Sequence, residues 1–151
     1  MHNTINYTWE QFDFDIAKLK RWITEVDFNP NMIVGLHRGG MVPAIALSHS
    51  LDVPCIPLEW STRDSKRCDH VTAQYITSLN NKGIKVLVVD DIVDSGLTIS
   101  SLKPHINLRT NSVLYTSLWY NPSQSCSMHF WANVIDRSVD DRWIIFPWEE
   151  K

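Results

Sequence analysis

Short, mostly hydrophobic runs recur along the chain, and they predict buried strands. A run without polar alternation suits a strand that helices cover on both faces of a parallel sheet. Two prolines in the second run argue that this strand lies at or near an edge of the sheet. The predicted strands are 32–36, 54–58, 86–89, 112–118 and 131–135.

Helical spacing precedes the first of these strands and fills two of the intervals between them. Thr8 and Gln11 have the spacing of a capping box. A hydrophobic stripe follows at three- and four-residue steps, formed by Trp9, Phe12, Ile16, Leu19 and Ile23. Further helices are predicted at 42–51 and from Leu97 onward, whereas the predominantly polar segment 59–81 predicts a long functional or mobile loop. Strands alternating with helices predict an α/β fold, with an open, mostly parallel, twisted sheet flanked by helices.

The composition is that of an ordinary globular domain. With 151 residues, of which 44% are hydrophobic and 21% charged, the chain predicts a single domain over 1–151. A net charge of −3 argues against nucleic acid or an anionic membrane as a partner. Neither a membrane-length apolar run nor a signal peptide is visible, so a cytoplasmic location is expected. Three widely spaced cysteines predict free thiols.

The most informative local pattern is KVLVVDDIVDSGLTIS, residues 85–100. Its hydrophobic run stops at Asp90 and Asp91, and Asp94 follows before the hydroxyl- and glycine-containing turn 95–98. Parallel sheets bind ligands at the carboxyl ends of their strands, and a helix N-terminus offers N–H groups to an anion. Adjacent carboxylates repel each other unless something compensates, and a ribose diol with Mg²⁺ would do so. The pattern therefore predicts a site for a phosphate and a sugar.

Other interpretations of these residues fit less well. Acidic residues often end strands, and Ser95 could simply cap the next helix, but three carboxylates within five residues are harder to explain in this way. Neither Gly40 nor Gly96 is followed by the lysine of a P-loop, and the GxGxxG of a dinucleotide site is absent. Together with Gly35 and Gly39, these glycines fall at two strand-to-helix turns, where a backbone can approach a ligand closely.

Three segments resemble one known family. DDIVDSGLT (90–98) resembles the phosphoribosyl-pyrophosphate (PRPP) motif of type I phosphoribosyltransferases. GLHRGGMVPA (35–44) is similar to the pyrophosphate loop and following helix of the xanthine-guanine branch, and RWIIFPWEE (142–150) is similar to its purine-covering C-terminal segment. YTWEQF near the N-terminus also has a counterpart, so the resemblance covers essentially the whole chain.

The resemblance implies a role for each residue of the acidic motif. Asp90 and Asp91 would hold the ribose hydroxyls, with Asp91 at the Mg²⁺-associated position. Asp94 would lie near N7 of the purine as a general base and belong to the PRPP site as well. The loop around the 5′-phosphate would consist of Ser95, Gly96, Leu97 and Thr98.

Residues outside that motif complete the implied site. Arg38 and Gly39 match the pyrophosphate loop, in which the family carries a non-proline cis peptide. Trp143 would stack on the purine, and Ile144 would contact it through its backbone. Asn121 stands where the xanthine-guanine branch has a lysine that reads O6 of the purine; an asparagine can still donate a hydrogen bond, but without charge.

Within the polar segment 59–81, four residues lie where the family has its flexible loop, which closes over PRPP. The same charged cluster could equally be a solvated surface loop. A closed loop excludes water and so prevents hydrolysis of PRPP. Arg67 is predicted to contact the pyrophosphate. The other residues of this loop singled out by the resemblance are Ser61, Thr62 and Arg63.

The resemblance implies a Mg²⁺-dependent enzyme of purine salvage, with a small C-terminal hood over the base. It would transfer the 5-phosphoribosyl group of PRPP to hypoxanthine, guanine or xanthine, giving the nucleoside 5′-monophosphate and pyrophosphate. Its partners would be PRPP, the purine and further copies of itself in a homodimer or homotetramer. Two alternatives remain: a PRPP- or nucleotide-sensing regulator with little turnover, and an enzyme for a different base.

Overall fold

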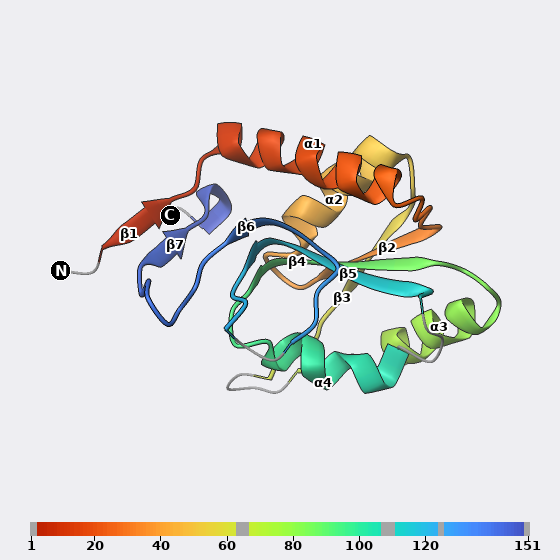
Figure 1. Ribbon diagram of the computed structural model, residues 1–151. Helices are drawn as coiled ribbons and strands as arrows, with labels where there is room; N and C mark the ends of the chain where they lie inside the picture. Colours follow the sequence, from red (N-terminus) through yellow and green to blue (C-terminus); the bar gives the residue numbers. More distant parts are fainter. Residues whose placement is uncertain (1–2, 63–66, 107–110, 124–125, 150–151) are drawn as a thin grey trace.

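A five-stranded parallel sheet forms the centre of the molecule, in the order β3-β2-β4-β5-β6 (Figure 1). The computed structural model describes residues 3–62, 67–106, 111–123 and 126–149. The strands are β2 (Met32–Leu36), β3 (Cys55–Leu58), β4 (Val86–Val93), β5 (Val113–Tyr120) and β6 (Phe130–Val134). The predicted parallel α/β fold is confirmed, and the proline-containing strand β3 lies at an edge.

Within the described residues, four α-helices cover the sheet, two on each face (Figure 1). On one face lie α1 (Trp9–Glu25) and α2 (Met41–Leu51), and on the other α3 (His70–Asn81) and α4 (Leu97–Ile106). Alternate residues of β4 point to opposite faces, so Leu87 joins the core under α1 and α2 while Val88 joins the core under α3 and α4. This double burial is why the strands read as continuous hydrophobic runs.

Helix α3 corrects the prediction of a long loop over 59–81. The Asp69 carboxylate caps the helix by accepting a hydrogen bond from the backbone N–H of Thr72. Only Ala73, Ile76 and Asn80 are buried on its inner face. Because one of these is small and one polar, the helical period was hidden in a segment of predominantly polar composition.

A second, two-stranded parallel sheet pairs β1 (Thr4–Asn6) with β7 (Trp143–Ile145), beside the start of α1 (Figure 1). The sequence pattern did not predict β1. A short 3₁₀ helix, η1 (Pro147–Glu149), follows β7 and places Trp148 in an aromatic cluster with Tyr7, Phe12 and Phe146. The predicted capping box of Thr8 and Gln11 is present at the start of α1.

Two further observations concern the lengths of the helices and the state of the cysteines. None of the helices in the described ranges is long and apolar enough to cross a membrane. The thiols of Cys55, Cys68 and Cys126 are free.

Candidate functional site

The strand order reverses between β2 and β4, and this is where the acidic motif lies. β2 and β4 pair from Met32 opposite Val86 to Gly35 opposite Val89, after which β2 ends and the chain turns toward α2. β4 continues to Val93, paired with β5 as far as Val93 opposite Tyr120. Asp90 and Asp91 are therefore inside the strand rather than after it, at the open crevice where sheets of this kind bind ligands.

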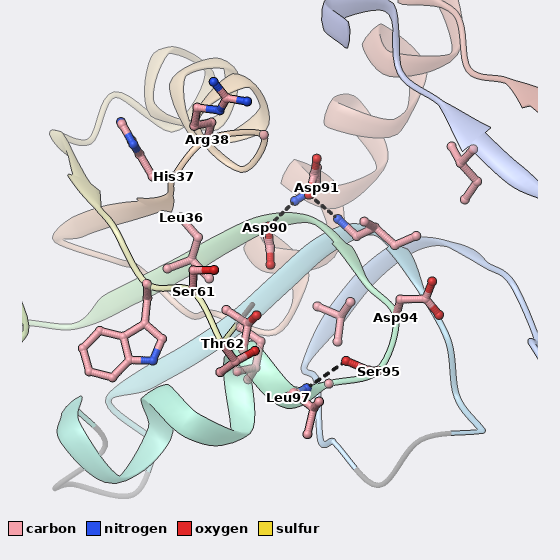
Figure 2. Close-up of a pocket in the computed structure, with 18 of the residues that line it drawn as sticks. Leu36, His37, Arg38, Ser61, Thr62, Asp90, Asp91, Asp94, Ser95 and Leu97 are labelled. Atoms are coloured by element: carbon pink, nitrogen blue, oxygen red, sulfur yellow. Dashed lines mark hydrogen bonds between the residues drawn. The ribbon is translucent and has the colours of Figure 1, made fainter. Parts of the chain in front are cut away.

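A cavity of about 360 Å³ occupies this crevice. Its walls come from the loop before α2, the end of β4, the loop before α4, the start of the polar segment and the segment around β7 (Figure 2). Most residues that the sequence assigned to a site line it. They are Arg38, Gly39, Ser61, Thr62, Asp90, Asp91, Asp94, Ser95, Gly96, Leu97, Thr98, Trp143 and Ile144.

The two adjacent carboxylates are held by the strand's own backbone. The N–H of Asp91 donates to Oδ1 of Asp90 (2.9 Å), and the N–H of Ile92 donates to Oδ1 of Asp91 (2.8 Å). In Figure 2 the two side chains leave β4 in opposite directions. Each carboxylate is thus fixed at the cavity wall by a local hydrogen bond from the backbone of β4.

The loop before α2 comes into close contact with this acidic pair. A Cβ atom added to Gly39 would lie 1.9 Å from Oδ2 of Asp91, so glycine is required for the approach. A Cβ atom on Gly40 would lie 2.6 Å from the carbonyl oxygen of Val89. The peptide bond between His37 and Arg38 is cis, as the resemblance implied.

The turn from β4 into α4 has the geometry of an anion site. Gly96 has a φ of +76°, which disfavours any residue with a side chain, and a Cβ there would lie 2.5 Å from Cβ of Cys126. Helix α4 begins at Leu97, whose N–H donates to Oγ of Ser95 (3.3 Å). Backbone N–H groups at a helix N-terminus favour negative charge, so this turn can hold a phosphate. Burial raises the pKa of the Cys126 thiol beneath it.

Asp94 is paired with an arginine that the sequence analysis did not single out. Nε of Arg137 donates to both oxygens of Asp94 at 3.2 Å, and Nη2 lies 3.1 Å from Oδ2. Arg137 lies three residues after β6 and lines the cavity. The signal that could have found it is its place after the last parallel strand, at the same carboxyl edge as Asp90.

The segment from β6 to β7 is fixed by its own acidic residues. Ser138 donates to Asp136 through its N–H and its hydroxyl, and Arg142 donates to Asp140 through Nε and Nη2. These hydrogen bonds from Arg142 lower the pKa of Asp140 to about 2. Trp143 follows directly and is 61% exposed, whereas the neighbouring Ile144 is buried.

A family model described as "Phosphoribosyl transferase domain" matches residues 4–151. The chain belongs to the phosphoribosyltransferase family. A xanthine-guanine phosphoribosyltransferase of Chromohalobacter salexigens is 24% identical over 148 residues, covering 98% of this chain and 85% of the relative. That of Idiomarina loihiensis is 29% identical over 120 residues, covering 78% and 70%. A solved structure of a purine phosphoribosyltransferase from Pyrococcus horikoshii has a TM-score of 0.74 and 26% identity, covering 99% of this chain and 96% of that one.

Asn121 lies in a different place from the one expected for a purine-contacting residue of this phosphoribosyltransferase. Its side chain is only 1% exposed and is not part of the cavity wall. Nδ2 donates to the carbonyl oxygen of Asp94 (3.1 Å) and to its Oδ1 (3.3 Å), and Oδ1 accepts from the N–H of Arg137 (3.2 Å). The Asn121 amide therefore links Asp94 to the backbone of Arg137 through hydrogen bonds. Because its donor and acceptor groups are used within the protein, it does not present them to the cavity.

Arg67 also lies apart from the cavity of this phosphoribosyltransferase. Its backbone carbonyl accepts from the N–H of Ser61 (2.8 Å), and its exposed guanidinium lies 3.6 Å from Glu59. The predicted contact with pyrophosphate would need this side chain to leave Glu59. Arg63, the other arginine predicted in this loop, lies outside the described residues.

Proposed function

We propose that the protein transfers the 5-phosphoribosyl group of PRPP to a 6-oxopurine, giving the nucleoside 5′-monophosphate and pyrophosphate. The observation that carries the proposal is one cavity that brings together the acidic pair of β4, the glycine turn before α4, the cis-peptide loop at Arg38 and the exposed ring of Trp143. Membership of the phosphoribosyltransferase family and the names of the relatives support it.

In this proposal the cavity has three parts. Asp90 and Asp91 accept hydrogen bonds from the ribose hydroxyls, and the turn 95–98 holds the 5′-phosphate through backbone N–H groups. Arg38 and the backbone at Gly39 face the pyrophosphate. Trp143 offers a ring for stacking on the purine, a contact that contributes about 1 to 3 kcal/mol per base.

The proposed reaction replaces one bond at C1 of the ribose with another. The bond from C1 to the pyrophosphate oxygen breaks with its electron pair, and a bond from C1 to N9 of the purine forms. The purine loses its N7 proton, and in this proposal Asp94 accepts it. Departing negative charge on pyrophosphate would be stabilised by Arg38.

Mg²⁺ fits the donor chemistry of this site. Carboxylate oxygens are the ligands that Mg²⁺ prefers, and it usually takes one or two of them together with substrate phosphates and water. Asp91, which lies against the loop at Gly39, is the residue we assign to the ion. When bound, the ion would supply positive charge that stabilises the departing pyrophosphate.

Nucleotide formation tests the proposed activity. The protein is incubated with PRPP, Mg²⁺ and, in turn, hypoxanthine, guanine, xanthine, adenine and uracil, and the nucleotide formed is measured. Turnover with a 6-oxopurine supports the proposal. Turnover with another base alone would assign a different substrate, and tight PRPP binding without turnover of any base would favour a sensing regulator. Analytical ultracentrifugation of the same sample tests the proposed homodimer or homotetramer.

A further inference from the structure

Arg137 spans the end of the cavity that the proposed function assigns to the base. On one side, Nε and Nη2 of its guanidinium donate to the carboxylate of Asp94. On the other side Nη1 donates to the carbonyl oxygens of Arg142 (2.5 Å) and Asp140 (3.4 Å), just before Trp143. The side chain therefore connects the carboxylate that faces the base with the segment that carries the exposed indole.

The guanidinium still has a donor to offer. An arginine has five N–H groups. Nε and one N–H of Nη2 serve Asp94, and the two of Nη1 serve the backbone carbonyls, which leaves one N–H of Nη2 without a partner among the described residues. Because Arg137 lines the cavity with 19% of its side chain exposed, the cavity presents a charged donor beside the Asp94 acceptor.

The Arg137 donor and the Asp94 acceptor together complement the hydrogen-bonding groups of one class of purine. A 6-oxopurine carries the acceptor O6 next to N7, whereas adenine carries a 6-amino donor at the same place. A guanidinium donates to the O6 acceptor of a 6-oxopurine, and a side-chain amide accepts from the 6-amino group of adenine. The N7 proton of the base would face Asp94. A 6-amino group facing Arg137 would set donor against donor and leave the cation without an acceptor.

We propose that Arg137 is the specificity-determining residue that selects 6-oxopurines over 6-aminopurines. The inference rests on the proposed function and deepens it, because it names the group that reads position 6. It supplies the positive charge that Asn121 lacks, and it does so from the segment after β6 rather than from the end of β5.

Kinetics of Arg137→Gln and Arg137→Lys test this assignment, with Arg142→Gln as the matched control. Arg142 is also an arginine of this segment, but it pairs with Asp140 and does not line the cavity. For Arg137→Gln we expect kcat/KM to fall about 10- to 100-fold with hypoxanthine, guanine and xanthine alike, and not to fall with adenine. Arg137→Lys should retain more of the 6-oxopurine preference, and Arg142→Gln should change neither value by more than about twofold.

A merely structural role would give a different result. Loss of Asp94 positioning alone would lower kcat/KM by the same factor for all bases, and an equal loss with adenine would overturn the proposal. A higher KM for PRPP with an unchanged KM for the base would also overturn it, because Arg137 would then serve the phosphates.

Calorimetric titration with inosine and adenosine 5′-monophosphates separates this inference from the proposed activity, since it needs no turnover. Wild-type protein should bind the inosine nucleotide more tightly, and Arg137→Gln should lose that preference. Equal binding of both nucleotides by the wild type would refute the role of Arg137. If no base is turned over, but the wild type prefers the inosine nucleotide and Arg137→Gln does not, only the proposed reaction is refuted.

Discussion

At the scale of single residues, two neighbouring glycines of the loop before α2 are required for different reasons. Gly39 faces a side chain, because its missing Cβ makes room for the carboxylate of Asp91. Gly40 faces backbone, because a Cβ there would meet the carbonyl oxygens of Leu36 and Val89. A carboxylate can rotate away from an added methyl group, whereas the backbone of a central strand cannot move without disturbing the core.

Gly39→Ala should therefore damage binding more than folding. Displacing the Asp91 carboxylate should weaken PRPP binding in the presence of Mg²⁺ by about tenfold or more, as measured by calorimetry. The free energy of unfolding in urea should stay close to that of the wild type. Gly40→Ala is the control and should lose stability clearly; the opposite ranking of the two variants would contradict this account.

Asp94→Asn should separate chemistry from binding. The amide has the shape of the carboxylate and can still accept from Arg137, but it cannot take up a proton. We expect kcat with the preferred purine to fall about 10²- to 10⁴-fold, while the Kd for PRPP changes little. Steady-state kinetics and calorimetry measure the two quantities, and an unchanged kcat would remove Asp94 from its proposed role.

At the scale of elements, a buried polar network joins the small sheet to the rest of the molecule. The hydroxyl of Tyr7, just after β1, donates to Oδ2 of Asp15 in α1, and Nδ2 of Asn133 in β6 donates to the same oxygen (2.7 Å). Burial, followed by the hydrogen bond to Asp15, raises the pKa of Tyr7 well above its ordinary value of 10.0. The network thus depends on a protonated tyrosine.

Tyr7→Phe should destabilise the protein in a pH-dependent way. At neutral pH the loss of the hydrogen bond to buried Asp15 should lower the free energy of unfolding by about 1 to 3 kcal/mol. Above pH 10 the unfolded wild type releases the Tyr7 proton while the folded state retains it, so the wild-type advantage should shrink as pH rises. Urea unfolding at pH 7, 9 and 10.5 measures the gap, and a gap that widens with pH would be inconsistent with this mechanism.

The helices and strands also show which elements can be predicted from sequence patterns and which cannot. Hydrophobic runs were sufficient for the central sheet, and two prolines placed β3 at its edge, because burial on both faces leaves a simple signal. β1 was not predicted, since three residues contain too little pattern, and α3 was hidden by its polar exposed face.

The sequence could not predict in which direction a side chain points when its residue follows the end of a strand. Most residues of the acidic motif and the glycine turns line the cavity. Asn121 and Arg137 both follow carboxyl ends of strands, yet the first turns inward and the second turns into the cavity. That choice depends on hydrogen-bond partners far away in the chain, such as Asp94 for both residues.

At the scale of the whole molecule, ligand binding should raise the thermal stability of the folded protein. A ligand that binds only the folded state at 100 times its Kd adds about 2.7 kcal/mol, which corresponds to about 5–10 °C in Tm for a chain of this size. We expect PRPP with Mg²⁺ to raise the Tm in a thermal melt by this amount. Chelating the metal with EDTA should remove most of the shift, and an identical shift with EDTA would exclude Mg²⁺ from PRPP binding.

Pairing of β1 with β7 brings together segments from nearly opposite ends of the described chain. A contact of such high sequence separation forms slowly, and during synthesis it has to wait until the last strand has been made. The segments that build the sheet, the acidic pair and the glycine turn are all made earlier. Because Thr4 pairs with Trp143, a change near Thr4 would disturb the strand that carries the exposed indole and, through it, the base half of the cavity.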